Sequence, residues 1–115
     1  METKIIKNKI SIEELKDLAH EQYIDIIKAV VDDAQGIMGV GGELHVDIQS
    51  VLVEQENSRG TDIWGINLYL EKSGDYFVEF DSMINLKPNV GNRTRNVEDE
   101  AIRKKIWEVV KRLVK

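Results

Sequence analysis

The sequence predicts a single α+β domain, in which a mostly antiparallel sheet carries an N-terminal and a C-terminal helix packed on one face. Three observations favour this fold class. A helix-capping signal stands near residue 11, alternating apolar and polar residues fill the middle of the chain, and an amphipathic stretch follows residue 99. The length of 115 residues is typical of one domain, so we assign residues 1–115 to it.

The first helix is predicted from Ile12 to about Gln22. Ser11 and Glu14 have the spacing of a capping box, in which each side chain satisfies a free backbone N–H of the other residue. Ile10 and Leu15 flank this box as the apolar pair of a hydrophobic staple. Together these residues define where the helix begins.

Residues 24–31 are rich in isoleucine and valine, which favours a strand, although their periodicity also fits a continuation of the first helix. Residues 33–36 have the composition of a turn, so residues 37–40 are expected to return as the second arm of a hairpin. The glycines between residues 39 and 42 indicate a bulge or bend just before Glu43.

Two further strands and a hairpin arm are predicted from alternation. In residues 43–52 and 64–70, apolar side chains recur at every second position. A turn at residues 72–75 then leads into residues 78–86, which stop before Pro88 because proline cannot donate to a ladder. This last arm is expected to point Val78, Phe80, Ile84 and Leu86 inward, and Glu79, Asp81 and Asn85 outward.

Residues 89–96 are typical of an irregular loop, and a C-terminal helix is expected from about Glu100 to near Lys115. Apolar residues recur there at helical spacing, and Asp99 or Asn96 is placed to cap the first turn. Acidic residues gather at the start of this helix and basic residues at its end, which suits the helix dipole.

The net charge of −5 is divided unevenly along the chain. Residues 1–85 hold 17 acidic and 7 basic side chains, whereas residues 86–115 hold 4 acidic and 9 basic ones. The acidic balance argues against specific nucleic-acid binding, because it would repel a polyanion. The basic last third indicates where another partner would bind.

Several classes of protein are excluded by composition. Without cysteine, the chain has no disulfide, no thiolate nucleophile and no cysteine-zinc site. No apolar run approaches the roughly 20 residues of a membrane helix, and the first ten residues lack the apolar core of a signal peptide. We therefore expect a cytoplasmic protein that does not bind a membrane.

Glu43, His45 and Asp47 alternate in the predicted strand 43–52, so their side chains would share one face of the sheet. Glu79 and Asp81 would join them from a neighbouring strand. Carboxylates with one imidazole suit Mg²⁺ or Mn²⁺, and the candidate metal ligands are His45, Asp47 and Asp81. The alternative is the solvated face of a half-exposed sheet, where such acids are expected without any function.

Arg93 and Arg95 lie in the loop before the last helix. Two guanidinium groups beside free backbone N–H groups would suit a phosphate or a carboxylate. The alternative is a basic loop that pairs with the acidic sheet of the protein itself. The glycines between residues 36 and 42 lack the spacing of a nucleotide-binding loop, and a predicted strand follows them where a helix would be needed.

Four sequence segments stand out as a set: GGELHxD at residues 41–47, WGxNLY at 64–69, EFDSxIN at 79–85 and GNRxR at 91–95. In this order they resemble a family of small uncharacterised prokaryotic proteins, a domain of unknown function of about this length. The resemblance implies no activity. It does mark the polar positions that belong to the family pattern, and we take these as the candidate binding residues: Glu43, His45, Asp47, Asn67, Glu79, Asp81, Asn85, Arg93 and Arg95.

No complete catalytic constellation is present, so the sequence favours a small binding or interaction domain that self-associates as a homo-oligomer. The expected partner is a small anionic ligand or a protein, with no cofactor. The alternative is a divalent-metal-assisted hydrolase or phosphate-handling enzyme, which would use Mg²⁺ or Mn²⁺ on the open acidic face around His45. The sequence leaves open whether the protein is an enzyme.

Overall fold

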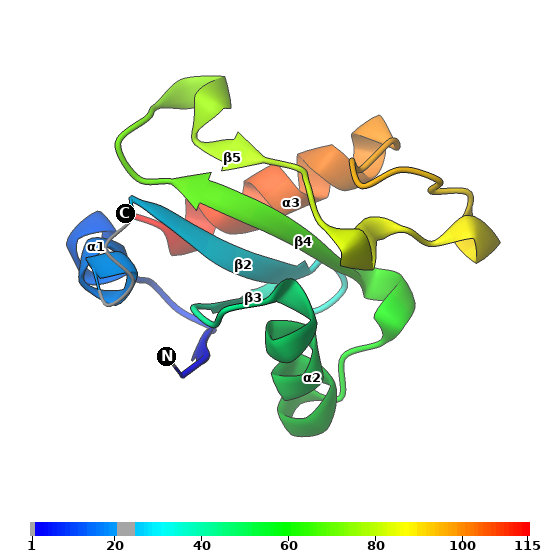
Figure 1. The fold of residues 1–115 in the computed structure, drawn as a ribbon, viewed down its shortest axis with the longest axis horizontal. Coiled ribbons are helices and arrows are strands. Elements are labelled where there is room, and N and C mark those ends of the chain that lie inside the picture. Colours follow the sequence, from blue (N-terminus) through cyan, green and yellow to red (C-terminus); the bar gives the residue numbers. More distant parts are fainter. Residues whose placement is uncertain (1, 21–24) are drawn as a thin grey trace.

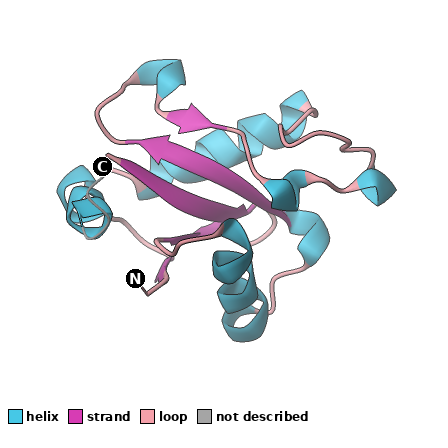
Figure 2. Ribbon diagram, in the orientation of Figure 1, coloured by secondary structure: helices cyan, strands magenta, loops and turns pink. Residues whose placement is uncertain are grey.

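The computed structural model describes residues 2–20 and 25–115, which form one antiparallel sheet with helices on both faces (Figures 1 and 2). The described strands are β1 (Lys4–Ile6), β2 (Ile26–Asp32), β3 (Ile37–Val40), β4 (Ile63–Tyr69) and β5 (Val78–Glu79). They lie in the order β1-β3-β2-β4-β5, and each pairs antiparallel with its neighbour. The longest pairing joins β2 to β4, from Ile26 opposite Tyr69 to Asp32 opposite Ile63.

Three α-helices and four short 3-10 helices complete the described part of the chain. They are α1 (Ile12–His20), α2 (His45–Glu56) and α3 (Glu100–Leu113), with η1 (Gly60–Asp62), η2 (Gly74–Tyr76), η3 (Met83–Asn85) and η4 (Pro88–Val90). In the view of Figure 1, α3 lies behind the sheet and α2 in front of it. We call these two sides of the sheet the α3 face and the α2 face. The predicted α+β class is confirmed.

The α3 face holds the main core. Because side chains alternate along a strand, Trp64, Ile66 and Leu68 of β4 all point to this side, where each is at most 1% exposed. Leu15 of α1 and Ile106 of α3 belong to the same buried cluster. The N-terminal and C-terminal helices therefore pack on one face, as the sequence predicts.

The caps of α1 and α3 follow from single residues. The backbone N–H of Glu14 donates to Ser11 Oγ at 3.0 Å, and the Ser11 hydroxyl donates to Glu14 Oε1 at 3.3 Å, so the two side chains meet each other directly. Asp99 caps α3 by accepting from the Ala101 N–H at 2.8 Å, which decides between the two predicted caps. The predicted end of the first helix at Gln22 lies outside the described residues.

The segment predicted as either strand or helix extension is a strand from Ile26 onward, since β2 pairs with β3 on one side and β4 on the other. Residue 24 of that prediction lies outside the described residues. The turn at residues 33–36 and the returning arm β3 are both confirmed. Gly36 takes a φ of +69° in this turn, a conformation that glycine adopts without strain.

Backbone hydrogen bonds join Ile10, before α1, to residues at the end of α3, and we call this contact the clasp. The Ile10 N–H donates to the Leu113 carbonyl at 2.7 Å, and the Lys115 N–H donates to the Ile10 carbonyl at 3.0 Å. Ile10 and Val114 form a parallel bridge here. The clasp ties the residues that precede α1 to the end of α3.

The strand predicted at residues 43–52 is wrong, because residues 45–56 form α2. The apolar residues that enter the core there are Ile48 and Leu52, which are four apart and lie on one side of a helix. Leu44 and Val46, which alternation placed with them, are 56% and 48% exposed. The face that the sequence predicts to be open and polar is therefore covered in part by α2.

A glycine allows α2 to approach the sheet closely. A Cβ atom on Gly39 of β3 would lie 2.7 Å from Ile48 Cγ2, closer than real carbon atoms pack. Ile48 and Leu52 form a second buried cluster here with Val30 and Ile63 of the sheet. The bend predicted before Glu43 is present, and it turns the chain from β3 into the helix.

The strand arm predicted at residues 78–86 is also wrong beyond Glu79. β5 contains only Val78 and Glu79, and the chain then leaves the sheet for η3. Asn85, predicted to point outward, is fully buried, whereas Leu86, predicted to point inward, is 39% exposed. Within residues 2–20 and 25–115, no helix has the length and apolar character needed to cross a membrane.

Candidate functional site

The uncovered half of the α2 face carries a row of polar side chains from three neighbouring strands. Lys28 of β2 stands opposite Asn67 of β4, and Asn67 stands opposite Glu79 of β5, so all three share one side of the sheet. Asn67 Nδ2 donates to Glu79 Oε1 at 2.8 Å, and the Tyr69 hydroxyl donates to the same oxygen at 3.0 Å. This hydrogen bond to Glu79 raises the pKa of Tyr69. The Glu79 carboxylate is therefore held in one position.

His45 joins this row from the first residue of α2. Its Nε2 lies 2.8 Å from the backbone carbonyl oxygen of Ile66, which can only accept, so Nε2 carries the hydrogen. Gly65 leaves room for the ring, because a Cβ atom there would lie 3.0 Å from His45 Cδ2 and 2.5 Å from Ser82. The structure thus fixes the tautomer in which Nδ1 holds the lone pair.

Burial lowers the pKa of His45 below its ordinary value. The hydrogen bond to Ile66 opposes this shift, and the positive charge of Lys28 adds to it. Asp81 and Arg95 also act on the ring, with opposite signs. The imidazole is therefore neutral at pH 7, with Nδ1 able to accept a hydrogen bond or a proton.

Asp81 and Arg95 form an ion pair at the edge of the row, with Arg95 Nε 2.6 Å from Asp81 Oδ1. Both side chains are about half exposed, so the pair adds at most about 1 kcal/mol to stability. Its importance lies in position, because it brings a carboxylate and a guanidinium beside His45 and Asn67. We call the whole cluster the His45 site, and its members are Lys28, His45, Asn67, Glu79, Asp81 and Arg95.

A buried amide brings Arg95 to the sheet. Asn85 Oδ1 accepts from the Gly65 N–H at 2.8 Å, while Asn85 Nδ2 donates to the carbonyls of Gly65 and Arg95, both at 2.9 Å. The side chain thus occupies the place of a further strand beside β4 and holds the backbone of the 80–98 segment there. Asn85 is therefore a structural residue, and the candidate binding role assigned to it from the sequence has no support in its position.

A second buried amide folds the loop that follows. Asn92 is 4% exposed, and its Nδ2 donates to the carbonyls of Asn85 and Asn96, each at 2.7 Å. Its Oδ1 accepts from the Glu98 N–H at 2.9 Å. The segment 80–98 is thus held together by amide side chains and by one isolated antiparallel bridge between Lys87 and Asn92.

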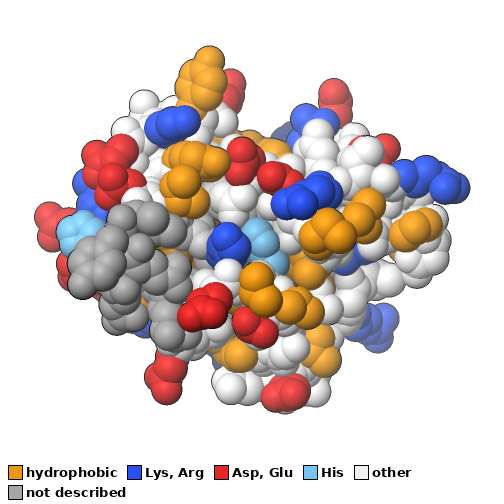
Figure 3. All heavy atoms as spheres, viewed as in Figure 1, with side chains coloured by type: hydrophobic (Ala, Val, Ile, Leu, Met, Phe, Trp, Pro, Cys, Tyr) orange, Lys and Arg blue, Asp and Glu red, His pale blue; other side chains and the backbone are white. Residues whose placement is uncertain are grey.

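Three polar atoms of the His45 site have no hydrogen-bond partner among the described residues: Lys28 Nζ, His45 Nδ1 and Asn67 Oδ1. Asn67 Oδ1 is also shielded from water, and a buried acceptor of this kind costs free energy until it is paired. Figure 3 shows a basic side chain directly beside a histidine near the centre of this face, with acidic and apolar side chains around them. The site therefore offers one cationic donor, Lys28 Nζ, and one acceptor, His45 Nδ1, beside the shielded oxygen of Asn67.

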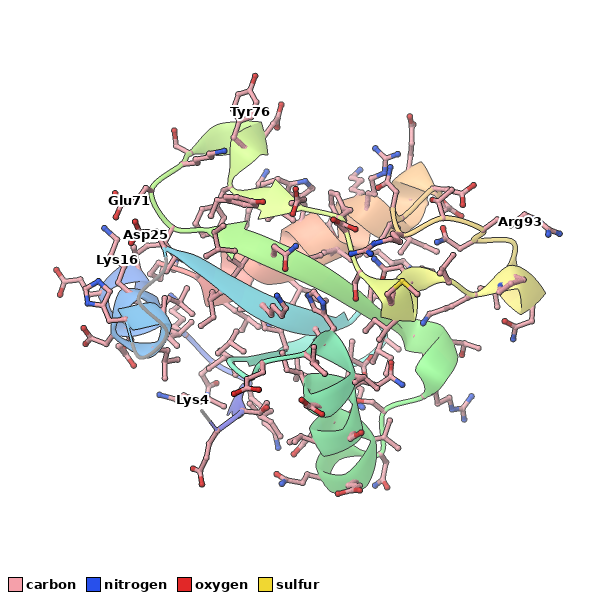
Figure 4. The ribbon with its side chains drawn as sticks, in the orientation of Figure 1. Lys4, Lys16, Asp25, Glu71, Tyr76 and Arg93 are labelled. Carbon is pink, nitrogen blue, oxygen red and sulfur yellow. The ribbon has the colours of Figure 1, made fainter. Side chains whose placement is uncertain are left out.

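The structure brings together five of the residues predicted for the site, namely His45, Asn67, Glu79, Asp81 and Arg95. The other predicted residues lie elsewhere. Glu43 and Asp47 are exposed around the start of α2, where helical spacing separates Asp47 from His45, and Arg93 points away from the sheet at the far end of its loop (Figure 4).

The anion site predicted at the 91–96 loop is occupied by a carboxylate of the protein itself. Glu98 Oε2 accepts from the backbone N–H groups of Arg93 at 2.6 Å and of Thr94 at 3.0 Å. The Arg93 hydrogen bond is the main reason why the pKa of Glu98 is lowered. The alternative reading, in which the loop pairs with acids of the chain, therefore describes Glu98 and the Asp81–Arg95 pair.

The structure removes the geometric argument for a Mg²⁺ or Mn²⁺ site around His45. That argument depended on a single strand carrying Glu43, His45 and Asp47 on one face, and these residues lead into and begin a helix. Across residues 2–20 and 25–115, no three histidine, aspartate or glutamate side chains come close enough together to hold a metal ion.

Sequence reasoning missed Lys28 and Tyr69 as members or neighbours of the site. The signal for Lys28 was present, since it is the one charged residue in an apolar strand that runs from residue 26 to 31. A lone lysine at such a position faces the less buried side of the sheet. Its proximity to Asn67 depends on the register of β2 against β4, which no local pattern reveals.

Comparison with protein families gave one match, a family described as "Protein of unknown function (DUF5674)", whose model covers residues 4–113. Comparison with curated proteins and with solved structures gave no match.

Proposed function

Since the chain belongs to the DUF5674 family, whose function is unknown, we propose a function from the His45 site: the domain binds a small polar anion there. The observation that carries this proposal is the Lys28 ammonium beside the neutral His45 ring, because neither Lys28 Nζ nor His45 Nδ1 has a hydrogen-bond partner among the described residues. Polar groups that fold without a partner are typical of ligand sites, because the ligand supplies the missing hydrogen bonds.

The charges of the site favour one class of ligand. Arg95 pairs with Asp81, and Glu79 accepts hydrogen bonds from Asn67 and Tyr69. Among the described residues, Lys28 has no carboxylate within 4.0 Å of its ammonium group. A carboxylate or phosphate group would pair with Lys28. A hydroxyl or amide donor on the same molecule would satisfy His45 Nδ1. The proposed ligand is therefore a small acid that also carries a hydrogen-bond donor.

A titration followed by ¹H–¹⁵N NMR tests this proposal, with lactate and glycerol 3-phosphate as probes and sulfate as an anion that lacks a hydroxyl group. We expect saturable shifts at residues 28, 45, 65 and 67, and at least tenfold weaker binding in Lys28→Gln. Lys9→Gln, which removes the same charge at an exposed position in another part of the chain, should bind as the wild type does. Shifts that avoid these residues, or no saturation by 10 mM of either probe, would contradict the proposal.

A second candidate function is proton transfer by His45, since a neutral imidazole with a fixed tautomer is suited to act as a general base. Nδ1 would accept a proton from a water molecule that attacks an ester or phosphate ester, and Lys28 would stabilise the charge that develops. Hydrolysis of p-nitrophenyl acetate and p-nitrophenyl phosphate, with and without Mn²⁺, tests it. Equal rates in the wild type and His45→Gln would exclude this candidate.

We also propose that the domain self-associates, on the ground of its uneven charge and its exposed apolar side chains. Leu44, Val46 and Met83, which come from the start of α2 and from η3, are each about half exposed or more. Sedimentation velocity at high micromolar concentration is the test, and Met83→Lys should weaken the association. A 13.2 kDa monomer at all concentrations would refute it.

A further inference from the structure

A concave region lies at α3, away from the His45 site. It is a groove of about 1010 Å³ between α3 and the segment that runs from the end of β4 through η2 and β5. Small-molecule sites in proteins usually measure roughly 300–1,000 Å³, so the groove has room for a ligand of ordinary size. None of the residues predicted from the sequence as binding residues lines it.

The walls of the groove are apolar. Phe77 and Phe80 line it from the β5 side, and Trp107 lines it from α3. All three rings pack on the main core yet are only partly buried, so part of each faces the groove. Val110 and Val114 extend the same surface along α3 and beyond its end. An apolar ligand body would displace water from these side chains, which is favourable in proportion to the area covered.

The rim of the groove is basic, although the chain as a whole is acidic. Within the described residues, none of its five cationic side chains has a carboxylate partner within 4.0 Å. Two of the cations lie over aromatic rings of the walls, with Lys111 Nζ 5.6 Å from the centre of Trp107 and Arg103 Cζ 5.9 Å from the centre of Phe80. The rim cations are Lys72, Arg103, Lys104, Lys111 and Lys115, against the two acids Asp75 and Glu100.

We propose that this groove binds an amphipathic anion of the fatty-acid class, with an alkyl chain along the aromatic walls and a carboxylate among the rim cations. Charge complementarity supports an anionic head group, because the five cations of the rim outnumber its two acids. Partly exposed aromatic rings beneath these cations provide the apolar surface that the chain requires. The site is separate from the His45 site, and the proposal does not depend on the function proposed for that site.

Decanoate is the probe, and titration calorimetry on the full chain is the measurement. We expect decanoate to bind with a dissociation constant of about 100 μM or lower, since burial of its methylene groups against the aromatic walls is favourable. Acetate, which has the charge without the chain, should not bind. Decyltrimethylammonium, which has the chain with the opposite charge, should bind at least tenfold more weakly.

Two neighbouring lysines of α3 offer a matched pair of variants. Lys104 lines the groove, whereas Lys105 is exposed outside it, so the two substitutions change the same charge on the same helix. Lys104→Gln combined with Lys111→Gln should weaken decanoate binding about tenfold. Lys105→Gln should leave it unchanged.

Fluorescence locates the bound chain. Trp64 is 1% exposed on the inner side of the sheet, so a change in tryptophan emission on adding decanoate reports Trp107. The change should disappear in Trp107→Phe while binding persists. Equal affinity for decyltrimethylammonium, unchanged affinity in the double variant, or emission changes that remain in Trp107→Phe would each overturn the proposal.

Discussion

The core of the α3 face and the segment 80–98 are both well ordered, but different forces order them. In the core, Ile66, Leu68 and Ile106 are fully buried, and hydrophobic burial supplies the stabilisation. In the segment 80–98, the buried side chains that connect the backbone are Asn85 and Asn92, and hydrogen bonds supply it. The first region tolerates small changes of shape at a graded cost, whereas the second depends on donors and acceptors that must be matched individually.

This difference explains why the His45 site lies where the segment 80–98 meets the sheet. The ladder of β4 continues past β5 through the Asn85 amide, so the chain can leave the sheet without leaving Gly65 unpaired. The departing chain carries Asp81 outward and returns Arg95 to it. A sixth strand in this place would have paired the backbone equally well, but its side chains would alternate and could not gather both charges beside His45.

The largest effect on stability is expected in the core of the α3 face. Leu68→Ala removes a fully buried side chain from the main core and should lower the free energy of unfolding by about 2–5 kcal/mol, because a cavity remains. Urea unfolding followed by circular dichroism measures this. A loss below about 1 kcal/mol would show that the core is less tightly packed than the structure indicates.

The next largest loss of stability is expected in the segment 80–98, which buried amide side chains hold in place. Asn85→Ala should lower the free energy of unfolding by about 2–4 kcal/mol, because it leaves the N–H and carbonyl of Gly65 buried without partners. Asn85→Asp should rescue little of this, since a carboxylate cannot donate to the Gly65 and Arg95 carbonyls. Asn89→Ala, at an exposed position of the same segment, is the control and should unfold as the wild type does.

A third substitution tests Gly65, where the segment 80–98 contacts β4. Gly65→Ala would place a Cβ atom 2.5 Å from Ser82 and 3.0 Å from the His45 ring, so we expect a loss of about 1–3 kcal/mol from overpacking. Displacement of the ring should also disturb the His45 titration seen by NMR. Gly60→Ala adds a Cβ atom with no neighbour within 4 Å, so it should affect neither quantity.

The smallest effect is a dependence on pH. Because the pKa of His45 is lower in the folded protein than in the unfolded chain, the unfolded chain binds more protons between the two values. The contribution of His45 to the free energy of unfolding should therefore be fully present above about pH 7.5. It should be lost as the pH falls below about 6.5, the pKa of histidine in the unfolded chain. His45→Gln should flatten this part of the profile. A His45 NMR titration midpoint at or above 6.5 would contradict the assignment.

The sequence was a good guide wherever one local pattern had one structural solution. Ser11 and Asp99 mark the starts of their helices because a side-chain oxygen there meets a free N–H within the same turn. Alternation from Trp64 to Leu68 predicts a strand with these apolar side chains on one face, and β4 has this arrangement. These features need no knowledge of the rest of the chain.

Prediction from the sequence failed where one pattern fits two kinds of secondary structure, or where a residue contacts another that is far away in the sequence. Ile48 and Leu52 fit both a strand and a helix, and the space above Gly39 decides for the helix. Asn85 is typical of turns, and its burial depends on Gly65, twenty residues earlier. The sequence named five of the six residues that the structure brings together around His45, yet the strand geometry that was to unite Glu43, His45 and Asp47 does not exist.

The clasp between Ile10 and Val114 has a consequence for the order in which the protein forms during translation. Leu113 receives the hydrogen bond from Ile10, and α3 supplies Ile106 and Val110 to the core of a sheet made from earlier residues. A ribosome-bound chain that has released only the sheet therefore exposes the apolar α3 face to solvent or to a chaperone. Completion of the fold waits until residue 114 has left the exit tunnel, so slow translation of the last segment prolongs the stage at which the nascent chain is prone to aggregate.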